Sequence, residues 1–336
     1  MNWRTEFFAE PATDTITLAA PVFTIGSCFA DEIGLRLLEN KFSVAVNPLG
    51  TVYNPISIHQ LLRFGLQNEL PTDESYLQRE EVHFNYHFHS SYSALSRNDL
   101  KNKIEEAVAS AHEFFKKTEW ILITYGTSFV YKLDGNQVVA NCHKMPSADF
   151  TKVLLTENEI AESFDGFYTL LKSINPRAKI ILTVSPVRHT KDTLELNSVS
   201  KSILRLACHT LSNKFPDVTY FPAYEIVMDD LRDYRFYKKD LIHPTTEAVD
   251  YIWEKFSQTY FNEPTQQFMA EWQKIKSDLR HKPFHPHSEK HQQFLQSVLK
   301  KLELLKQTVN VDIEIAEIKS QILNPKILNP KSHRAQ

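Results

Sequence analysis

Short apolar runs recur along the chain, and longer stretches with helical periodicity separate them. Five runs are strand candidates: residues 21–26, 42–47, 120–125, 179–184 and 218–221. Strands that are apolar throughout and alternate with helices are typical of a parallel sheet covered on both faces. The pattern therefore predicts an α/β protein with one central parallel sheet.

Apolar residues at helical spacing mark the helices around this sheet. In residues 99–117 they are Ile104, Val108, Ala111 and Phe115. Similar patterns occupy residues 157–173 and 195–213. The last helix of the layer is expected to begin after His243, with Pro244-Thr245-Thr246 as its start signal.

Two segments depart from simple alternation. Residues 68–98 are polar and aromatic without a clear period, so we expect a long loop over the sheet edge, and long loops are often functional. Residues 129–141 predict a hairpin, with Asp134-Gly135 as the turn between two short apolar pairs.

The character of the chain changes after residue 263, which ends the predicted catalytic domain, residues 1–263. Residues 264–320 predict a charged helical appendage with an apolar stripe formed by Phe294, Val298, Leu302, Leu305 and Val309. This stripe needs a surface to pack on, either the main domain or a second copy in a homo-oligomer. Residues 321–336 contain the pentapeptide Ile-Leu-Asn-Pro-Lys twice and predict a disordered tail.

Composition narrows the class of protein. The 336 residues are 42% hydrophobic and 24% charged, enough for one substantial core. The formal net charge of -3, without basic runs, argues against a nucleic-acid partner. Neither a signal peptide nor an apolar run of about 18 residues is present, so we expect a cytoplasmic protein without a membrane span. Cys28, Cys142 and Cys208 are too scattered for a disulfide framework or a zinc site, so we expect neither metal nor cofactor.

Gly26-Ser27 is the turn between the first strand and a helix. In α/β folds the carboxyl ends of parallel strands carry the ligands, and amides at a helix start can receive an oxyanion. Ser27 is therefore a candidate nucleophile. The alternative is that Ser27 only caps the helix that begins near Cys28.

Asp240 and His243 supply the other groups that a serine nucleophile needs. They lie between the fifth strand and the last helix, which places them at the same sheet edge as Ser27. A serine hydroxyl becomes a good nucleophile when an imidazole takes its proton and a carboxylate orients that imidazole. The alternative is a turn capped by Asp240 beside an ordinary, hydrogen-bonded histidine.

Glycines follow the second and third strands. Gly50 ends Asn47-Pro48-Leu49-Gly50, and Gly126 begins Gly126-Thr127-Ser128. Each could be a plain turn residue. The chain has only seven glycines, however, and two at one sheet edge favour a shared site, where the Gly50 amide can come close to a reacting atom.

Other candidates are weaker. Cys28 becomes a nucleophile only if helix-start amides lower its thiol pKa, and its side chain is expected to point away from that of Ser27. The histidines at 83–89 and 281–291 lack the carboxylates or cysteines of a metal site, so we interpret them as solvated. Arg188, followed by His189 after the fourth strand, can bind a carboxylate or phosphate, or form a structural ion pair.

The order of these motifs resembles the SGNH (GDSL-like) hydrolase superfamily. More closely, Ile-Gly-Ser-Cys-Phe-Ala with Asn-Pro-Leu-Gly-Thr-Val-Tyr-Asn-Pro is similar to the GSCFA-domain family, and the likeness continues through residues 139–144 and 185–189. It implies a three-layer, flavodoxin-like α/β/α sandwich with strand order 2-1-3-4-5. It also implies Ser27 as nucleophile, His243 as base and Asp240 as its orienting acid, with the Ser27 and Gly50 amides in the oxyanion hole.

Ser128 departs from the superfamily pattern. The third motif of the superfamily is Gly-x-Asn, whose side-chain amide donates to the oxyanion, and a serine hydroxyl is shorter and rotates freely. Losing one such donor can cost about 2.7 to 4 kcal/mol of transition-state stabilisation. Asn141 or His143 on the hairpin is a candidate substitute. The candidate substrate-binding residues are Asn47, Gly126, Asn141, His143, Arg188 and His189.

These residues favour a serine-dependent hydrolase that cleaves small-acyl esters through an acyl-serine intermediate. By resemblance, the ester is expected to be a carbohydrate ester or another small molecule. Two alternatives remain open: an O-acyltransferase that acts on a sugar hydroxyl, and a non-catalytic binding module on the same fold.

Overall fold

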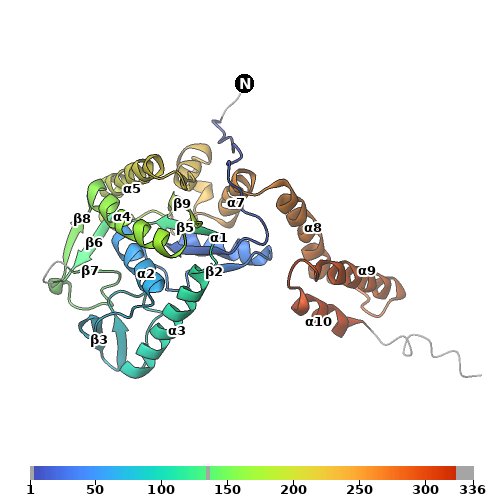
Figure 1. The fold of residues 1–336 in the computed structure, drawn as a ribbon. Coiled ribbons are helices and arrows are strands. Elements are labelled where there is room, and N and C mark those ends of the chain that lie inside the picture. The colour runs from blue at the N-terminus through green and yellow to red at the C-terminus, as the bar shows by residue number, and fades with distance from the viewer. Residues whose placement is uncertain (1–3, 134–136, 323–336) are drawn as a thin grey trace, which may run out of the picture. The chain divides into compact units, whose positions relative to one another are not determined.

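The computed structural model describes residues 4–133 and 137–322 (Figure 1). The chain divides into two compact units, Met1–Phe261 and Asn262–Gln336. Within the described residues, no helix has the length and apolar character needed to cross a membrane.

A five-stranded parallel sheet forms the centre of the first unit. Its strands are β1 (Val22–Gly26), β2 (Val44–Val46), β5 (Trp120–Tyr125), β9 (Lys179–Val184) and β10 (Val218–Tyr220). Their spatial order is β10-β9-β5-β1-β2. Counted along the sequence, this is the expected order 2-1-3-4-5, and the predicted α/β fold class is confirmed.

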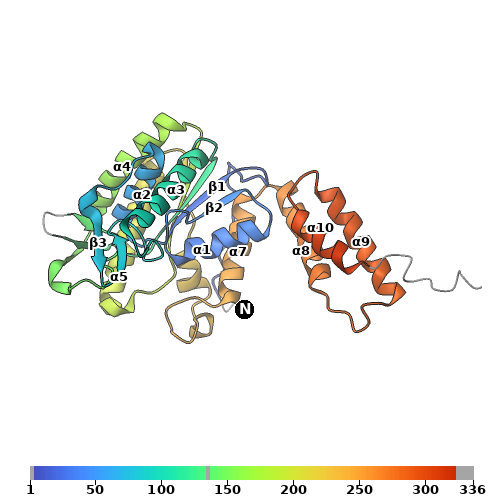
Figure 2. The same cartoon turned by 90° about the horizontal axis from the view of Figure 1, so that it is seen from below.

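The central strands β1, β5 and β9 are buried on both sides because their side chains alternate between two helical layers. Phe23, Ile121 and Ile180 belong to a core shared with residues of four helices. These are α2 (Pro55–Gln67), α3 (Arg97–Phe115), α4 (Glu157–Ile174) and α5 (Leu194–Lys214). The opposite face of the sheet packs against α1 (Cys28–Glu39) and α7 (Thr246–Tyr260), and Figure 2 shows α1 and α7 across the sheet from α2, α3 and α4.

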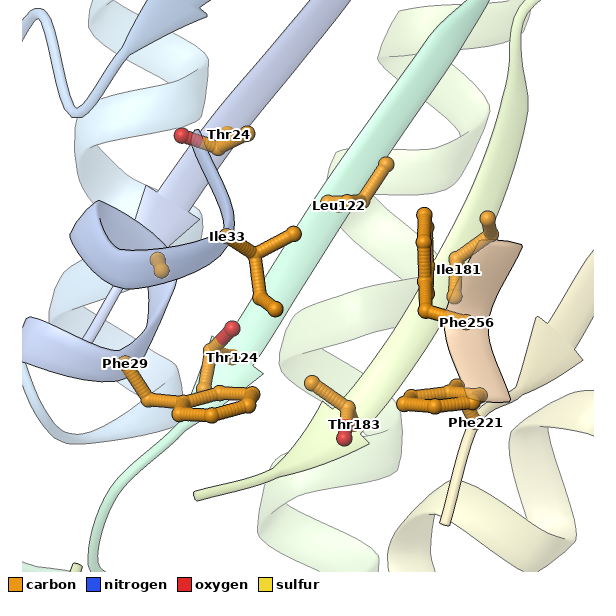
Figure 3. Close-up of a pocket in the computed structure, with 10 residues that line it drawn as sticks. Thr24, Phe29, Ile33, Leu122, Thr124, Ile181, Thr183, Phe221 and Phe256 are labelled. Carbon is orange, nitrogen blue, oxygen red and sulfur yellow. The ribbon is translucent and has the colours of Figure 1, made fainter. Parts of the chain in front are cut away.

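A small cavity lies on the α1 and α7 side of the sheet. In Figure 3, Thr183 lies near the rings of Phe29 and Phe221, and Thr24 lies at the other end of the lining. The two threonine hydroxyls are buried and have no hydrogen-bond partner within the described part of the chain. Because buried and mainly apolar side chains line the cavity, we assign it to core packing rather than to a ligand site.

The segment 68–98 contains more regular structure than the expected loop. It includes an antiparallel pair, β3 (Tyr76–Arg79) and β4 (Val82–Asn85), and α3 already begins at Arg97. Each strand is only four residues long, which is too short to give a clear period in the sequence.

The predicted hairpin forms between β6 (Phe129–Lys132) and β7 (Val138–Val139). A third strand, β8 (Thr151–Leu154), pairs with β6 on its other edge and was missed from the sequence. The proposed turn at Asp134-Gly135 lies outside the described residues. After β10, the chain forms the short α6 (Ala223–Glu225) and a π-helical turn, Ile226–Asp230.

The second unit consists of α8 (Glu263–Arg280), α9 (Glu289–Leu305) and α10 (Asp312–Gln321). Helix α9 packs against both α8 and α10, and Val298 and Leu302 of its apolar stripe are buried. The stripe therefore finds a packing surface inside the appendage itself, which the sequence analysis did not consider. Of the predicted tail, residues 323–336 lie outside the described part of the chain.

Candidate active site

Ser27 lies in a tight turn between β1 and α1. The residue is completely buried, and its Oγ accepts a hydrogen bond from the Phe29 amide at 3.3 Å as the N-cap of α1. Gly26 adopts a φ of +134°, and a Cβ there would lie 2.2 Å from the Thr124 carbonyl oxygen. Only glycine fits this position. Ser27 thus caps α1, and whether it is also a nucleophile stays a prediction.

Asn47 supports this turn from the end of β2. Its Oδ1 accepts a hydrogen bond from the Gly26 amide at 2.9 Å, and its Nδ2 donates to Asp31 at 2.7 Å. Thr51 donates to the other oxygen of Asp31 at 3.1 Å. Burial raises the pKa of Asp31, and the hydrogen bonds from Asn47 and Thr51 act in the opposite direction. Sequence reasoning missed Asp31, although it lies four residues after Ser27 on the same helix.

Asp240 and His243 form a hydrogen-bonded pair in the loop before α7. His243 Nδ1 lies 2.7 Å from Asp240 Oδ2, and Asp240 Oδ1 accepts hydrogen bonds from the Ile242 and His243 amides at 2.9 and 3.0 Å. The backbone amides, followed by the His243 side chain, lower the pKa of Asp240 far below its ordinary value. An ionised Asp240 fixes Nδ1 as the protonated ring nitrogen and leaves Nε2 as the base.

The structure assembles the predicted catalytic residues into two groups. A Cβ on Gly126 would lie 3.3 Å from the Ser27 Cβ, so Gly126 belongs with Gly26 and Asn47 around the serine. Asp240 and His243 form the second group. Within the described residues, no hydrogen bond joins Ser27 Oγ to His243. Bonds of this kind often tighten only when substrate is bound.

Each predicted oxyanion donor is engaged by another protein group. The Ser27 amide donates to the Thr124 carbonyl at 3.1 Å, and the Gly50 amide donates to the Asn47 carbonyl at 2.8 Å. The Ser128 hydroxyl is buried against α5, where it donates to the Ser200 carbonyl at 3.2 Å. Ser128 is thus held by α5, and the oxyanion hole stays a prediction.

Asn141 and His143 belong to a separate hydrogen-bonded cluster. Asn141 donates to Ser90 Oγ at 3.1 Å and accepts from the His143 amide at 2.8 Å. The His143 ring lies 2.9 Å from the Asn85 carbonyl and stacks on Phe84. These contacts connect the hairpin to the 68–98 segment, and among the described residues neither side chain is hydrogen-bonded to Ser27.

His189 and Arg188 follow β9. Burial, and then the charge of Lys201, lowers the pKa of His189 to about 4, so its ring is neutral at pH 7. Its buried Nε2 has no hydrogen-bond partner within residues 4–133 and 137–322, and its ring meets that of Tyr53 edge-on at 5.9 Å. Arg188 donates to the Leu241 carbonyl at 3.0 Å and so contacts the loop that carries His243.

Cys28 does not have the environment of a reactive thiol. Burial raises its pKa, and the nearby Asp31 carboxylate raises it further. A thiolate at this position is therefore disfavoured.

Lys201 is a buried residue that the sequence analysis overlooked. Its Nζ donates to the carbonyls of Gly126 and Ser185, each at 2.7 Å, and so joins the segments that follow β5 and β9. The residue is 1% exposed, and burial lowers its pKa to about 7. A signal was present, because Lys201 lies at helical spacing with the apolar residues Leu204 and Cys208.

We expect Lys201→Met to flatten the pH dependence of stability. Between pH 7 and pH 10 the unfolded chain carries a proton on Lys201 that the folded protein has lost. The free energy of unfolding of the wild type should therefore rise with pH, by up to about 1.4 kcal/mol per pH unit more than that of Lys201→Met. Urea unfolding at several pH values measures this slope.

The matched control is Lys214→Met, because Lys214 is half exposed and pairs with Asp165. It should keep the wild-type slope. Equal slopes for the wild type and Lys201→Met would contradict the shifted titration of Lys201.

Within the described residues, no group of three or more histidine, cysteine, aspartate or glutamate side chains is placed to hold a metal ion.

Comparisons with known proteins give two family matches. The model of the GSCFA family matches residues 21–256, and the model described as GSCFA domain protein, C-terminal domain, matches residues 272–324. No curated protein matches the chain. The solved structures similar to it include a carbohydrate esterase family 3 protein from Talaromyces cellulolyticus, at 11% identity and a TM-score of 0.33. A mutant acetyl esterase with an acetate ion is similar at 11% identity and a TM-score of 0.31. Each match covers 75% of this chain and 99% of the other.

Proposed function

The chain belongs to the GSCFA family, and on this premise we propose that it is a serine-dependent ester hydrolase whose catalytic residues lie in the Gly26-Ser27 turn and in the loop from Asp240 to His243. The observation that carries this proposal is the 2.7 Å hydrogen bond from His243 Nδ1 to Asp240. A histidine oriented in this way by a carboxylate presents a basic Nε2, which is what a serine nucleophile requires.

The proposed reaction has two steps. Ser27 Oγ attacks the acyl carbonyl carbon while His243 Nε2 takes the hydroxyl proton, and His243 then gives that proton to the departing alcohol. Water attacks the acyl-serine next, with His243 again accepting a proton, and the acid leaves as Ser27 regains its hydrogen. The burial of Ser27 favours a small acyl group, because little space surrounds the serine.

A fluorophosphonate probe tests the nucleophile directly. We expect the probe to label the wild type and Cys28→Ala but not Ser27→Ala, because phosphonylation needs an activated serine hydroxyl. Intact-protein mass spectrometry measures the adduct. Absence of labelling in a folded wild type would count against the proposal, and labelling that survives in Ser27→Ala would assign the chemistry to another residue.

The complete burial of Ser27 also supports a second candidate, acyl transfer to a sugar hydroxyl. A serine screened from bulk water gives a bound alcohol an advantage over water as acyl acceptor. Transfer and hydrolysis share the acyl-serine and differ in the second step. Product analysis with and without an acceptor alcohol separates them.

A third candidate is a non-catalytic binding module. It is supported by the Gly50 amide and the Ser128 hydroxyl, which are both bonded to protein carbonyls. A binding module predicts that Ser27→Ala keeps the full affinity for its ligand and that the wild type resists the fluorophosphonate.

A further inference from the structure

A pocket of about 190 Å³ lies beside the loop that carries His243. Its wall includes the side chains of Arg188, Met228, Arg232, Asp233, Tyr234 and Tyr237. Most of them come from the segment between β10 and α7, and Arg188 follows β9. The pocket is smaller than the pockets of about 300 to 1,000 Å³ that take drug-sized ligands, so a group the size of one sugar or less suits it.

Backbone hydrogen bonds connect this pocket to the His243 loop. The Arg188 amide donates to the Ile242 carbonyl at 3.1 Å, and the Lys238 amide donates to the His243 carbonyl at 2.7 Å. Tyr237 forms an antiparallel bridge with Pro244. The pocket wall is thus joined through the backbone to the loop that orients the proposed base.

The Arg188 side chain is held in the pocket wall and keeps N–H donors that are available to a ligand. Its guanidinium carbon lies 5.8 Å from the centre of the Tyr234 ring and 5.5 Å from that of Tyr237. It donates one hydrogen bond, to the Leu241 carbonyl. No carboxylate among the described residues forms a salt bridge with it. A guanidinium has five N–H donors, so several remain for a ligand.

The charge of the pocket favours an anion. Asp233, the acidic residue in its wall, already pairs with Arg235 at 3.1 Å. Arg232 approaches Asp229 only at 3.9 Å, and both side chains are highly exposed. The positive charges of Arg188 and Arg232 therefore dominate, and arginine matches the oxygens of carboxylates and phosphates particularly well.

We propose that this pocket binds an anionic group, a carboxylate or a phosphate, on the alcohol part of the ester substrate. Tyr234 and Tyr237 offer aromatic faces beside the guanidinium, which suits a sugar ring that carries the charge. This inference rests on the proposed function, because it names the class of ester that the Ser27 site would cleave.

Ligand binding to the inactive Ser27→Ala protein tests the pocket without relying on catalysis. The probes are methyl glucuronide, which carries a carboxylate, glucose 6-phosphate, and neutral methyl glucoside, with affinities measured by calorimetry. We expect at least one charged sugar to bind about 10- to 100-fold more tightly than the neutral one, because hydrogen bonds to charged groups are strong. The two charged probes distinguish a carboxylate site from a phosphate site.

Arg232→Gln in the same background should reduce this preference about tenfold or more. The matched control is Arg177→Gln, because Arg177 precedes β9 and so lies at the opposite end of the sheet from Arg188. It should leave every affinity unchanged. Equal affinities for charged and neutral sugars, or a preference that survives both Arg188→Gln and Arg232→Gln, would overturn the inference.

The test separates this inference from the proposed function. Fluorophosphonate labelling of Ser27 without any preference for charged sugars would leave the hydrolase standing and exclude the anion pocket. Arginine-dependent binding of a charged sugar by a protein that resists labelling would support the anion pocket and count against the hydrolase.

Discussion

His243→Ala is expected to lower kcat for ester hydrolysis by about four to six orders of magnitude. Removal of the histidine from a serine–histidine–aspartate site takes away both the base that activates the serine and the acid that protonates the leaving alcohol. Asp240→Asn should cost about 10⁴-fold, because an amide no longer fixes the required ring tautomer. Steady-state kinetics with a small-acyl aryl ester measure both effects.

His209→Ala is the control for this experiment. His209 lies exposed on α5, where its ring contacts Asn213, and it has no role in the proposed mechanism. Its kcat should equal that of the wild type. If His243→Ala retained kcat within about tenfold of the wild type, His243 could not be the general base. His189, which is neutral at pH 7 and follows β9, would then be the next residue to test.

The second large effect concerns stability. Gly26→Ala is expected to lower the free energy of unfolding by about 2 to 6 kcal/mol. This figure adds the cost of a backbone conformation that alanine rarely adopts to the cost of a steric clash. The added Cβ would lie 2.2 Å from the Thr124 carbonyl oxygen, in the backbone of the neighbouring strand, which cannot move aside easily. Urea denaturation measures the change.

Gly166→Ala provides the matched control. Gly166 lies inside α4, and apart from the adjoining residues and backbone of that helix nothing lies within 4 Å of the position of an added Cβ. Alanine is favoured over glycine in a helix, so this variant should be as stable as the wild type or more stable by about 0.5 to 1 kcal/mol. Equal stability of Gly26→Ala and the wild type would show that the turn can relax, contrary to the close packing described here.

The centre of the sheet could be predicted from the sequence because β1, β5 and β9 are buried on both faces. Such burial leaves continuous apolar runs, and the observed β5 and β9 have the predicted bounds. The edge strand β2 is shorter than predicted, since one of its sides has no neighbour to pair with. Helix α2 was missed, although Asn54 caps it and Pro55 occupies its first turn, two start signals that were present in the sequence.

The candidate site could be predicted from the sequence only where its residues lie close together along the chain. Gly26 and Ser27 are adjacent in the sequence, and Asp240 and His243 are three residues apart. The geometry of each pair therefore follows from the turn that contains it. The partner of Ser128 could not be inferred, because Ser200 is 72 residues away and meets it only through the packing of α5. Lys201 was missed for a similar reason, since its acceptors are the carbonyls of Gly126 and Ser185, on two other segments.

The capping bond of Ser27 has a consequence for the lifetime of an acyl-enzyme. The hydroxyl oxygen that accepts from the Phe29 amide is the atom that acylation would convert into an ester oxygen, a weaker acceptor. Acylation would therefore weaken the start of α1, by at most the roughly 0.5 to 2 kcal/mol that complete loss of an N-cap costs. Release of the acyl group restores the cap. If Ser27 is the nucleophile, the helix would therefore favour deacylation, which suits rapid turnover better than storage of an acyl group.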